Sequence, residues 1–309
     1  MVKQLKTVGV LLSTYNGEST LKRQVDSIFK QKDVNIQIFI RDDGSCDNTC
    51  SVINKLCEEY KGKINYIIEE NIGYKKSFLK LTSLIGKCDY YCFADQDDIW
   101  EEEKLYNAIT ALENINDPIK LYTSSVKLVN QDLNSIGFNN ISNMPNKLEA
   151  LFTRGRLAGC TFVFSLEVLR LTIELARVNY ENNQMPSHDF LVAALAFSCG
   201  TVYMDQNSYI KHIRYKDSVT CGKNGLLKRI KGEIYGIFFY KNICLHMAQM
   251  LMEYNIPYLH SELIPYLESV VNYKKTIKNR VNLLKNSEMT CGIKVCDWET
   301  KFKILIGTF

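Results

Sequence analysis

The chain has 309 residues, of which 46% are hydrophobic, so one large domain with a sizeable core is expected and global disorder is excluded. The eleven cysteines form no Cys-x-x-Cys pair and no secretory signal opens the sequence, which indicates free thiols in a reducing cytosol and argues against a zinc site. The net charge of +4 is unevenly distributed, since residues 223–309 carry +6 and residues 1–222 carry −2. The sequence contains no run of about eighteen apolar residues, so no transmembrane helix is predicted.

Short apolar runs alternate with helical patterns in the first third of the chain. This alternation predicts an α/β fold with a mostly parallel sheet flanked by helices. The strands are expected at Thr7 to Ser13, Val34 to Ile40, Ile64 to Ile68 and Tyr90 to Ala94. Helices are expected over 21–29, from Asp47 or Asn48 to about Tyr60, and over about 75–85.

Three carboxylates, Asp95, Asp97 and Asp98, follow the buried strand that ends at Ala94. Mg²⁺ and Mn²⁺ take oxygen ligands, often one or two carboxylates together with substrate phosphates. The pattern therefore indicates a metal-diphosphate site. The alternative is a polar turn that leads into a helix near Glu101, with Asp98 as its N-cap.

Polar loops follow three of the expected strands, at Ser13 to Glu18, Arg41 to Ser45 and Asp95 to Asp98. Ligands of parallel α/β sheets bind beyond the carboxyl ends of the strands, so these loops are expected to converge. Neither Gly-x-Gly-x-x-Gly nor a P-loop occurs, which argues against a dinucleotide oxidoreductase and an NTPase. A nucleotide site with a metal is the favoured interpretation.

These loops carry a resemblance to a known family. Ser-Thr-Tyr-Asn-Gly-Glu, Arg-Asp-Asp-Gly-Ser and Ala-Asp-Gln-Asp-Asp-Ile-Trp, in this order, resemble family 2 glycosyltransferases of the GT-A fold over roughly residues 5–220. The last motif is most similar to bacterial rhamnosyltransferase-like members, which build surface polysaccharides. The resemblance implies an inverting transfer from a nucleotide-diphosphate sugar, either a dTDP- or a UDP-sugar, to an acceptor hydroxyl, assisted by Mg²⁺ or Mn²⁺.

The resemblance also implies roles for individual residues. Asp97 would bind the metal directly, Asp95 would face the ribose or the metal, and Asp98 would support them. Tyr15 has simple packing as its alternative, and Asp42 could instead hold its own turn by bonding the backbone. The nucleotide-binding set implied by the motifs is Ser13, Thr14, Tyr15, Asn16, Glu18, Asp42, Asp43, Asp95 and Gln96.

The second half of the chain supplies the expected acceptor side. A strand over 121–129 and a polar loop over 130–146 precede Gly159, which would let the backbone approach a sugar or would merely allow tight strand packing. Asp189, at the start of an apolar helix, matches the family's catalytic base, with His188 supporting the acceptor pocket. The alternative is that Ser187 or Asp189 only caps this helix.

A strand over 201–204 leads to His212, which by resemblance completes the metal shell; a structural histidine is the alternative. Ile210 stands where the family usually has arginine, so Lys211 or Arg214 is expected to serve as the phosphate cation. Residues 216–222 are expected to form a flexible loop that closes over the donor.

Residues 223–309 are helical in pattern, with helices expected over 230–252 and 263–284, so we divide the chain into a GT-A catalytic domain (1–222) and a helical extension (223–309). The basic extension could contact a membrane that carries a lipid-linked glycan acceptor, or it could pack on the body or form a dimer. The expected location is the cytoplasm, and the membrane alternative would place the chain peripherally at the inner face of the cell membrane. Two other functions compete with glycosyl transfer: a nucleotidyltransferase, whose glycine-rich basic loop is missing, and a non-catalytic nucleotide- or glycan-binding partner of a polysaccharide assembly complex. No nucleic acid partner is expected.

Overall fold

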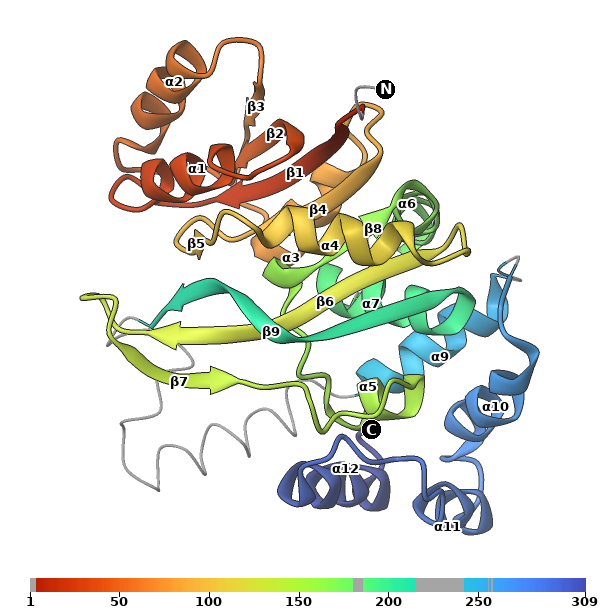
Figure 1. Cartoon of the computed structure of the whole chain (residues 1–309). Coiled ribbons are helices and arrows are strands. Elements are labelled where there is room, and N and C mark those ends of the chain that lie inside the picture. The colour runs from red at the N-terminus through yellow and green to blue at the C-terminus, as the bar shows by residue number, and fades with distance from the viewer. Residues whose placement is uncertain (1–3, 180–185, 215–241, 255, 257) are drawn as a thin grey trace.

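The computed structural model describes residues 4–179, 186–214, 242–254, 256 and 258–309. In this part of the chain, strands form one mixed sheet and helices lie on its faces (Figure 1). The strands are β1 Lys6–Thr14, β2 Val34–Asp42, β3 Ile64–Ile68, β4 Tyr90–Ala94, β5 Ile99–Trp100, β6 Lys120–Val129, β7 Ser135–Asn139, β8 Val163–Ser165 and β9 Thr201–Ile213. Their order is β3-β2-β1-β4-β8-β6-β9-β5, with β7 paired to β6.

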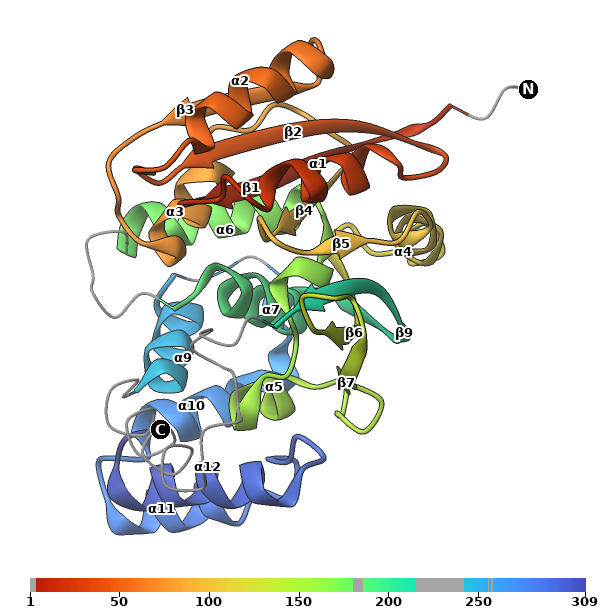
Figure 2. The same cartoon turned by 90° about the vertical axis from the view of Figure 1, so that its left-hand side faces the viewer.

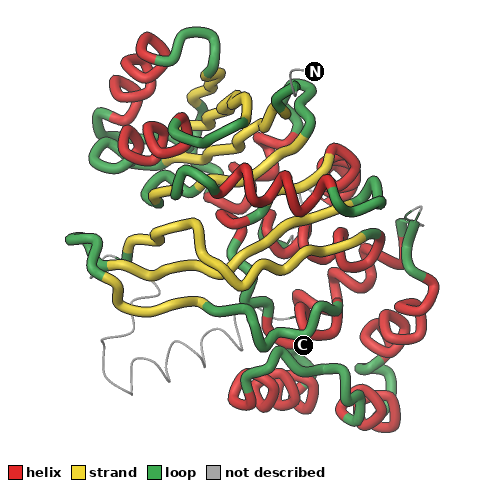
Figure 3. The backbone as a smooth tube through the Cα atoms, viewed as in Figure 1, coloured by secondary structure: helices red, strands yellow, loops and turns green. Residues whose placement is uncertain are grey.

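Helices connect the strands and fill the C-terminal end. They are α1 Leu21–Phe29, α2 Thr49–Glu59, α3 Tyr74–Thr82, α4 Lys104–Glu113, α5 Leu148–Arg154, α6 Leu166–Asn179, α7 His188–Cys199, α9 Ile243–Glu253, α10 Ile264–Asn272, α11 Ile277–Leu284 and α12 Lys294–Ile306, with short 3-10 turns at Gly159–Thr161 and Ser261–Leu263. Figure 3 shows that the described chain after β9 adds helices and loops and no strand. None of the described helices is both long and apolar enough to span a bilayer.

Strand β1 lies at the centre of the N-terminal part and is buried on both faces. Val8, Val10 and Leu12 belong to an apolar cluster with α1, α2 and α4, whereas Leu11 packs into a second cluster with α3, α6 and α7. Strands buried on both sides read as continuous apolar runs, which is why the sequence pattern is clear here. The strands β3, β2, β1 and β4 are mutually parallel, as predicted. The α/β fold with a mixed, mostly parallel sheet and C-terminal helices is confirmed.

Strand β9 is longer than predicted and decides the layout of the site. It runs parallel to β6 and, near its end, pairs antiparallel with β5, where Ile99 faces Lys211. Because β5 directly follows the carboxylates, this pairing brings His212 beside them. The short strand β5 also displaces the predicted helix start, so α4 begins at Lys104 with Glu103 at its N-cap, and the alternative of Asp98 as the cap of this helix does not hold.

Two further element predictions differ from the structure. Residues 130–146, predicted as a loop, contain β7, which forms a hairpin with β6. The single helix predicted over 263–284 is two helices, because Thr276 starts a new one and its side chain accepts a hydrogen bond from the Asn279 N–H. Of the helix predicted over 230–252, α9 forms the last part, and residues 230–241 lie outside the described residues, as does the predicted loop over 216–222.

The C-terminal helices share their core with the catalytic part. Leu245, Met247 and Leu267 belong to the same apolar cluster as α3, α5 and α7. Helices α11 and α12 lie side by side at one end of the molecule, opposite α2 (Figures 1 and 2). The proposed boundary at residue 222 falls within residues 215–241, outside the described residues, and stays a prediction.

Candidate active site

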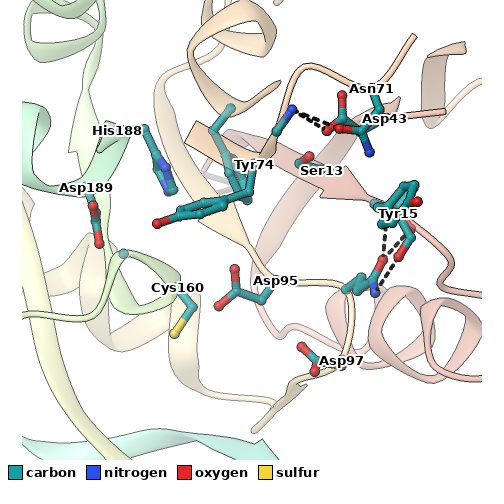
Figure 4. A pocket seen from close by; sticks show the side chains of 15 residues that line it. Ser13, Tyr15, Asp43, Asn71, Tyr74, Asp95, Asp97, Cys160, His188 and Asp189 are labelled. Atoms are coloured by element: carbon teal, nitrogen blue, oxygen red, sulfur yellow. Dashed lines mark hydrogen bonds between the residues drawn. The ribbon is translucent and has the colours of Figure 1, made fainter. Parts of the chain in front are cut away.

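The polar loops predicted to converge do so around one pocket of about 500 Å³ (Figure 4). It lies beyond the carboxyl ends of β1, β2 and β4, where a doubly covered sheet leaves an opening. Side chains and backbone from both halves of the chain line it: Ser13, Thr14, Tyr15, Asp43, Asn71, Gly73, Tyr74, Phe78, Asp95, Gln96, Asp97, Gly159, Cys160, His188 and Asp189.

Gln96 ties the first loop to the carboxylate turn. Its Oε1 accepts hydrogen bonds from the hydroxyl of Thr14 at 2.6 Å and from the N–H of Tyr15 at 2.9 Å, and its Nε2 donates to the Tyr15 carbonyl at 3.1 Å. Tyr15 lines the pocket and is 46% exposed. This exposure leaves room for contact with a ligand, and its role in nucleotide binding stays a prediction.

Four possible metal donors gather beside this turn. One ligand atom from each of Asp95, Asp98, Cys160 and His212 lies within 4.8 Å of the other three. His212 Nδ1 is 2.7 Å from Oδ1 of the fully buried Asp98, whose Oδ2 has no hydrogen-bond partner in the described part of the chain. A buried carboxylate oxygen without a donor is costly, so the donor set fits a bound cation.

The carboxylates at this turn repel one another, and this repulsion, together with burial, raises the pKa values of two of them. Burial and the charges of Asp98 and Asp97 raise the pKa of Asp95 to about 8, and burial with the charge of Asp98 also raises the pKa of Asp97. Burial by itself would lower the pKa of His212, but the hydrogen bond to Asp98 and the charges of both neighbouring carboxylates raise it. A cation at this point would relieve the repulsion.

Asp97 lies in the same pocket but outside the four-donor cluster. Figure 4 shows its carboxylate separated from that of Asp95. The roles predicted for Asp97, Asp95 and His212 as metal ligands stay predictions, and Asp98 is the carboxylate that contacts His212.

The second loop is held by a buried arginine. Arg41 is fully buried and pairs through Nη1 with Oδ1 of Asp43, and Nη1 also donates to Ser77 Oγ at 2.9 Å. Asp43 in turn accepts the N–H groups of Ile72 and Gly73 at 2.9 and 3.0 Å. The Asp43 carboxylate thus shapes the loop that follows β3 while one side of it faces the pocket.

Three of the residues predicted to contact the nucleotide form hydrogen bonds within and between the loops. Asp42 accepts hydrogen bonds from the N–H and hydroxyl of Ser45, which matches the alternative that it holds its own turn. Asn16 accepts from the Cys46 N–H at 2.9 Å, and Glu18 accepts from the N–H and side chain of Asn48. The residues that line the pocket include Ser13, which bonds Ser77, but not Asp42, Asn16 or Glu18. The nucleotide contacts of the latter three stay predictions.

The acceptor side is built from the start of α7 and the glycine turn. A Cβ on Gly159 would lie 2.8 Å from the Cβ of Asp189, so the close approach of the two backbones requires glycine. Asp189 Oδ1 accepts the Phe190 N–H at 2.8 Å, and Ser187, at the N-cap, makes no side-chain cap bond. Burial lowers the pKa of Lys75 below its usual value, and the nearby Asp189 charge counters this.

His188 is part of the pocket wall. Its ring stacks on Phe78 at a centroid distance of 4.0 Å and meets the edge of Phe93 at 4.6 Å. Burial lowers its pKa to about 4, so the imidazole is neutral near pH 7. A neutral, packed ring is consistent with support of the pocket wall, and the predicted role of His188 in the acceptor pocket stays a prediction.

Several residues that line the pocket are not predicted from the sequence: Asn71, Gly73, Tyr74, Phe78 and Cys160. The first three follow β3, and the rule applied to the other strands, that polar loops at carboxyl ends form sites, would have found them. Cys160 carries no such signal. It enters the site because the turn Gly159–Thr161 passes beside the carboxylates.

Comparison with known proteins places this site in a family. The model described as "Glycosyl transferase family 2" matches residues 9–169, just over half of the chain. A dTDP-rhamnosyl transferase, RfbG of Shigella flexneri, is 43% identical over 105 residues, which cover 33% of this chain and 36% of that protein. The β-1,3-glucosyltransferase WfaP of Escherichia coli, named for UDP-Glc and a GlcNAc-diphosphoundecaprenol, is 33% identical over 110 residues, 35% of this chain and 42% of that protein.

Solved structures share the fold. The S. aureus TarS fragment 1–349 in complex with UDP-GlcNAc superposes with a TM-score of 0.57 at 12% identity, covering 98% of this chain and 82% of that one. At this identity the similarity shows the fold alone. The matches to the two curated relatives cover less than half of each of those proteins.

Proposed function

The chain belongs to glycosyl transferase family 2 and so takes its sugar from a nucleotide sugar, and we propose that it transfers this sugar with inversion to an acceptor hydroxyl, assisted by a divalent cation. One observation carries the proposal: a single pocket holds the carboxylates of Asp95 and Asp97 and, on its other side, that of Asp189 (Figure 4). The side with Asp95 and Asp97 could bind the donor diphosphate through a cation while Asp189, on the other side, contacts the attacking hydroxyl.

The proposed donor is dTDP-rhamnose, and the proposed role is surface polysaccharide synthesis. The support is the 43% identity to a dTDP-rhamnosyl transferase, over a third of the chain. A UDP-sugar is the alternative, since a relative at 33% identity is named for UDP-Glc. The nucleotide would lie against Ser13, Tyr15 and Asp43, where an exposed aromatic ring and a carboxylate line the pocket.

The proposed cation, Mn²⁺ or Mg²⁺, would be held by Asp95, Asp97 and His212, with Asp98 holding the imidazole through its 2.7 Å bond. Carboxylates suit both ions, and the imidazole nitrogen favours Mn²⁺. When bound, such a cation neutralises charge on the departing diphosphate. A buried carboxylate that orients a ligating histidine is a recurrent device in metal sites.

The proposed base is Asp189. The acceptor oxygen forms a bond to the anomeric carbon, the bond from that carbon to the diphosphate oxygen breaks, and the hydroxyl proton passes to the Asp189 carboxylate. The helix start fixes this carboxylate, and Gly159 allows a close backbone approach beside it. One of its oxygens already accepts the Phe190 N–H, which leaves the other for the proton.

Arg214 is the better candidate for the phosphate cation that the family places near the histidine. Lys211 lies 3.6 Å from Glu101 and is directed toward β5. Arg214 lies two residues after His212, just beyond the end of β9, and its charge acts to lower the pKa of His212, which supports this assignment. The proposed acceptor is a glycan or a lipid-linked glycan at the cytoplasmic side of the membrane.

Donor selection by thermal shift tests the proposal. The full chain is heated with dTDP-rhamnose, UDP-glucose, UDP-galactose, UDP-N-acetylglucosamine or GDP-mannose, each with and without Mn²⁺. A ligand at one hundred times its dissociation constant stabilises the fold by about 2.7 kcal/mol, which raises the Tm of a chain of 309 residues by roughly 4 °C. A Mn²⁺-dependent shift with dTDP-rhamnose supports the full proposal, and no shift with any donor would overturn it.

Two variants separate donor binding from chemistry. Asp97→Ala is expected to abolish both the Mn²⁺-dependent shift and transfer, whereas Asp189→Ala is expected to keep the shift and lose transfer about 10²–10⁴-fold. Ser187→Ala is the matched control on the same helix start and should keep both. If Asp189→Ala retains most of the activity, the base assignment is wrong.

A further inference from the structure

Helix α12 presents an apolar stripe that is exposed to solvent in the described part of the chain. Spacings of three, four and three residues place four apolar side chains on one face of the helix. We call them the α12 stripe: Val295, Trp298, Phe302 and Leu305, with exposed fractions of 76, 73, 48 and 54%. The opposite face buries Thr300 and Ile304 against the body. The helix is thus anchored on one side and apolar on the other.

The stripe is more than scattered surface apolarity. Single exposed apolar residues are ordinary, but a continuous row with a tryptophan marks an interaction surface. The neighbouring α11 adds Ile277, which is 81% exposed. The two helices are joined, since Arg280 Nη1 donates to the Leu305 carbonyl at 2.9 Å. Both lie at the end of the molecule (Figure 2).

The charges around the stripe are unbalanced. Residues 274–309 contain eight Lys and Arg but three Asp and Glu. Glu288 pairs with Lys147, Glu299 pairs with Arg154 and with Lys303 of its own helix, and Asp297 accepts the Cys291 N–H. Within the described residues, no ion pair of these three acids includes Lys294 or Lys301.

Two lysines border the stripe. Lys294 and Lys301, seven residues apart, lie on the same flank of α12, and Lys301 Nζ is 5.8 Å from the Trp298 ring centre. Neither forms an ion pair with a residue that the structure describes. A basic flank beside an apolar face that includes tryptophan is the pattern of helices that lie in a lipid interface.

We propose that the α12 stripe docks on an anionic lipid surface, with Trp298 and Phe302 entering the interface and Lys294 and Lys301 meeting the headgroups. Tryptophan suits this position because its ring is apolar and its N–H is polar. A second copy of the chain fits less well, since a two-fold contact on this stripe would bring the same unneutralised lysines together. The proposal is independent of the sugar transferred.

Tryptophan fluorescence with vesicles provides a direct test. The chain has two tryptophans, and Trp100 is 3% exposed, so a spectral change on binding reports Trp298. The full chain is titrated with vesicles of phosphatidylglycerol and phosphatidylcholine, and with phosphatidylcholine alone. A blue shift with the anionic vesicles, weakened by 0.5 M NaCl and absent with neutral vesicles, is expected. No shift with either vesicle would overturn the proposal.

Two variants test the residues. Lys294→Gln with Lys301→Gln keeps the tryptophan and is expected to lower the vesicle partition coefficient about 30-fold, from roughly fivefold per lysine. Phe302→Ser is expected to weaken binding as well, measured by vesicle sedimentation. The matched control, Ile136→Ser with Phe138→Ser, removes two exposed apolar side chains of β7 and should leave binding unchanged.

Two further readouts distinguish lipid docking from a catalytic defect and from self-association. Transfer to a soluble acceptor should be the same for the lysine variants and the parent chain, so loss of the proposed function and loss of docking are distinguishable. If the chain instead dimerises in light scattering, and Phe302→Ser abolishes the dimer while vesicles give no shift, the stripe is a self-contact and the proposal is wrong.

Discussion

Asp43 is expected to be a structural residue as much as a ligand contact. Its carboxylate pairs with the fully buried Arg41 and accepts the N–H groups of Ile72 and Gly73. The substitution Asp43→Ala removes all three interactions while leaving the guanidinium in the interior. It therefore tests whether this buried pair holds the second and third loops together.

The magnitude follows from these contacts. Breaking a buried ion pair by removing one partner costs about 3–5 kcal/mol, because the remaining charge is left uncompensated. Part of this is recovered here, since Arg41 also donates to Ser77 at 2.9 Å, to the Glu70 carbonyl at 2.9 Å and to Glu69 at 3.2 Å. Two lost backbone bonds add roughly 1 kcal/mol each. A loss of about 4 kcal/mol is expected, a large share of a typical total of about 5–15 kcal/mol.

Urea unfolding followed by circular dichroism measures this loss. The control is Asp132→Ala, an exposed acid in the β6–β7 hairpin, which should change the free energy of unfolding by less than about 0.5 kcal/mol. The double variant Arg41→Met with Asp43→Ala should cost less than the two single variants added together, since no charge is stranded. A loss below about 1 kcal/mol for Asp43→Ala would refute the reasoning.

Three further predictions concern the site. Gly159→Ala should reduce the turnover number at least tenfold with the donor-induced thermal shift intact, because the added Cβ would displace Asp189; unchanged turnover would contradict this. Asp98→Asn should weaken Mn²⁺ binding about 10–100-fold, followed by electron paramagnetic resonance of free Mn²⁺, and a change below about threefold would mean that Asp98 does not hold His212. Burial lowers the pKa of His188 to about 4 in the folded state from 6.5, so its contribution to stability is present above pH 6.5 and is lost between pH 6.5 and 4, by up to about 3 kcal/mol. In His188→Phe this pH dependence of the free energy of unfolding, measured with urea, should disappear. A pH dependence equal to that of the parent chain would contradict the prediction.

The N-terminal half was predictable because its signals are local. Strands buried on both faces are apolar without a break, and each polar loop follows directly on its strand, as at Ser13 and Asp95. These loops converge because parallel strands have their carboxyl ends at the same edge of the sheet. Alternating strands and helices in the sequence imply such a parallel sheet. The α/β fold and the pocket position followed from these rules.

The metal-side geometry could not be predicted in the same way. His212 meets Asp98 because β5, two residues long, pairs with β9 more than a hundred positions later in the chain. So short a strand gives no periodic signal, and its register depends on the whole sheet. The resemblance implies Asp97 as the direct metal ligand and Asp98 as a supporting residue, and in the structure Asp98 is the carboxylate that contacts His212. Cys160 enters by the same kind of long-range contact.

Helix α7 couples the candidate active site to the C-terminal helices, so the C-terminal region cannot be exchanged independently of the site. Its residues from Leu191 to Cys199 are all buried, and the His260 N–H donates to the carbonyl of Ser198 at 2.8 Å. Helix α7, which carries Asp189 in its first turn, is thus supported by segments that follow residue 241 in the sequence. A chimera that exchanged everything after residue 222 for another protein's tail would uncover the back of α7 and loosen Asp189 at its front. Grafting for new acceptors is therefore best attempted in the loops around Gly159, with the C-terminal helices retained.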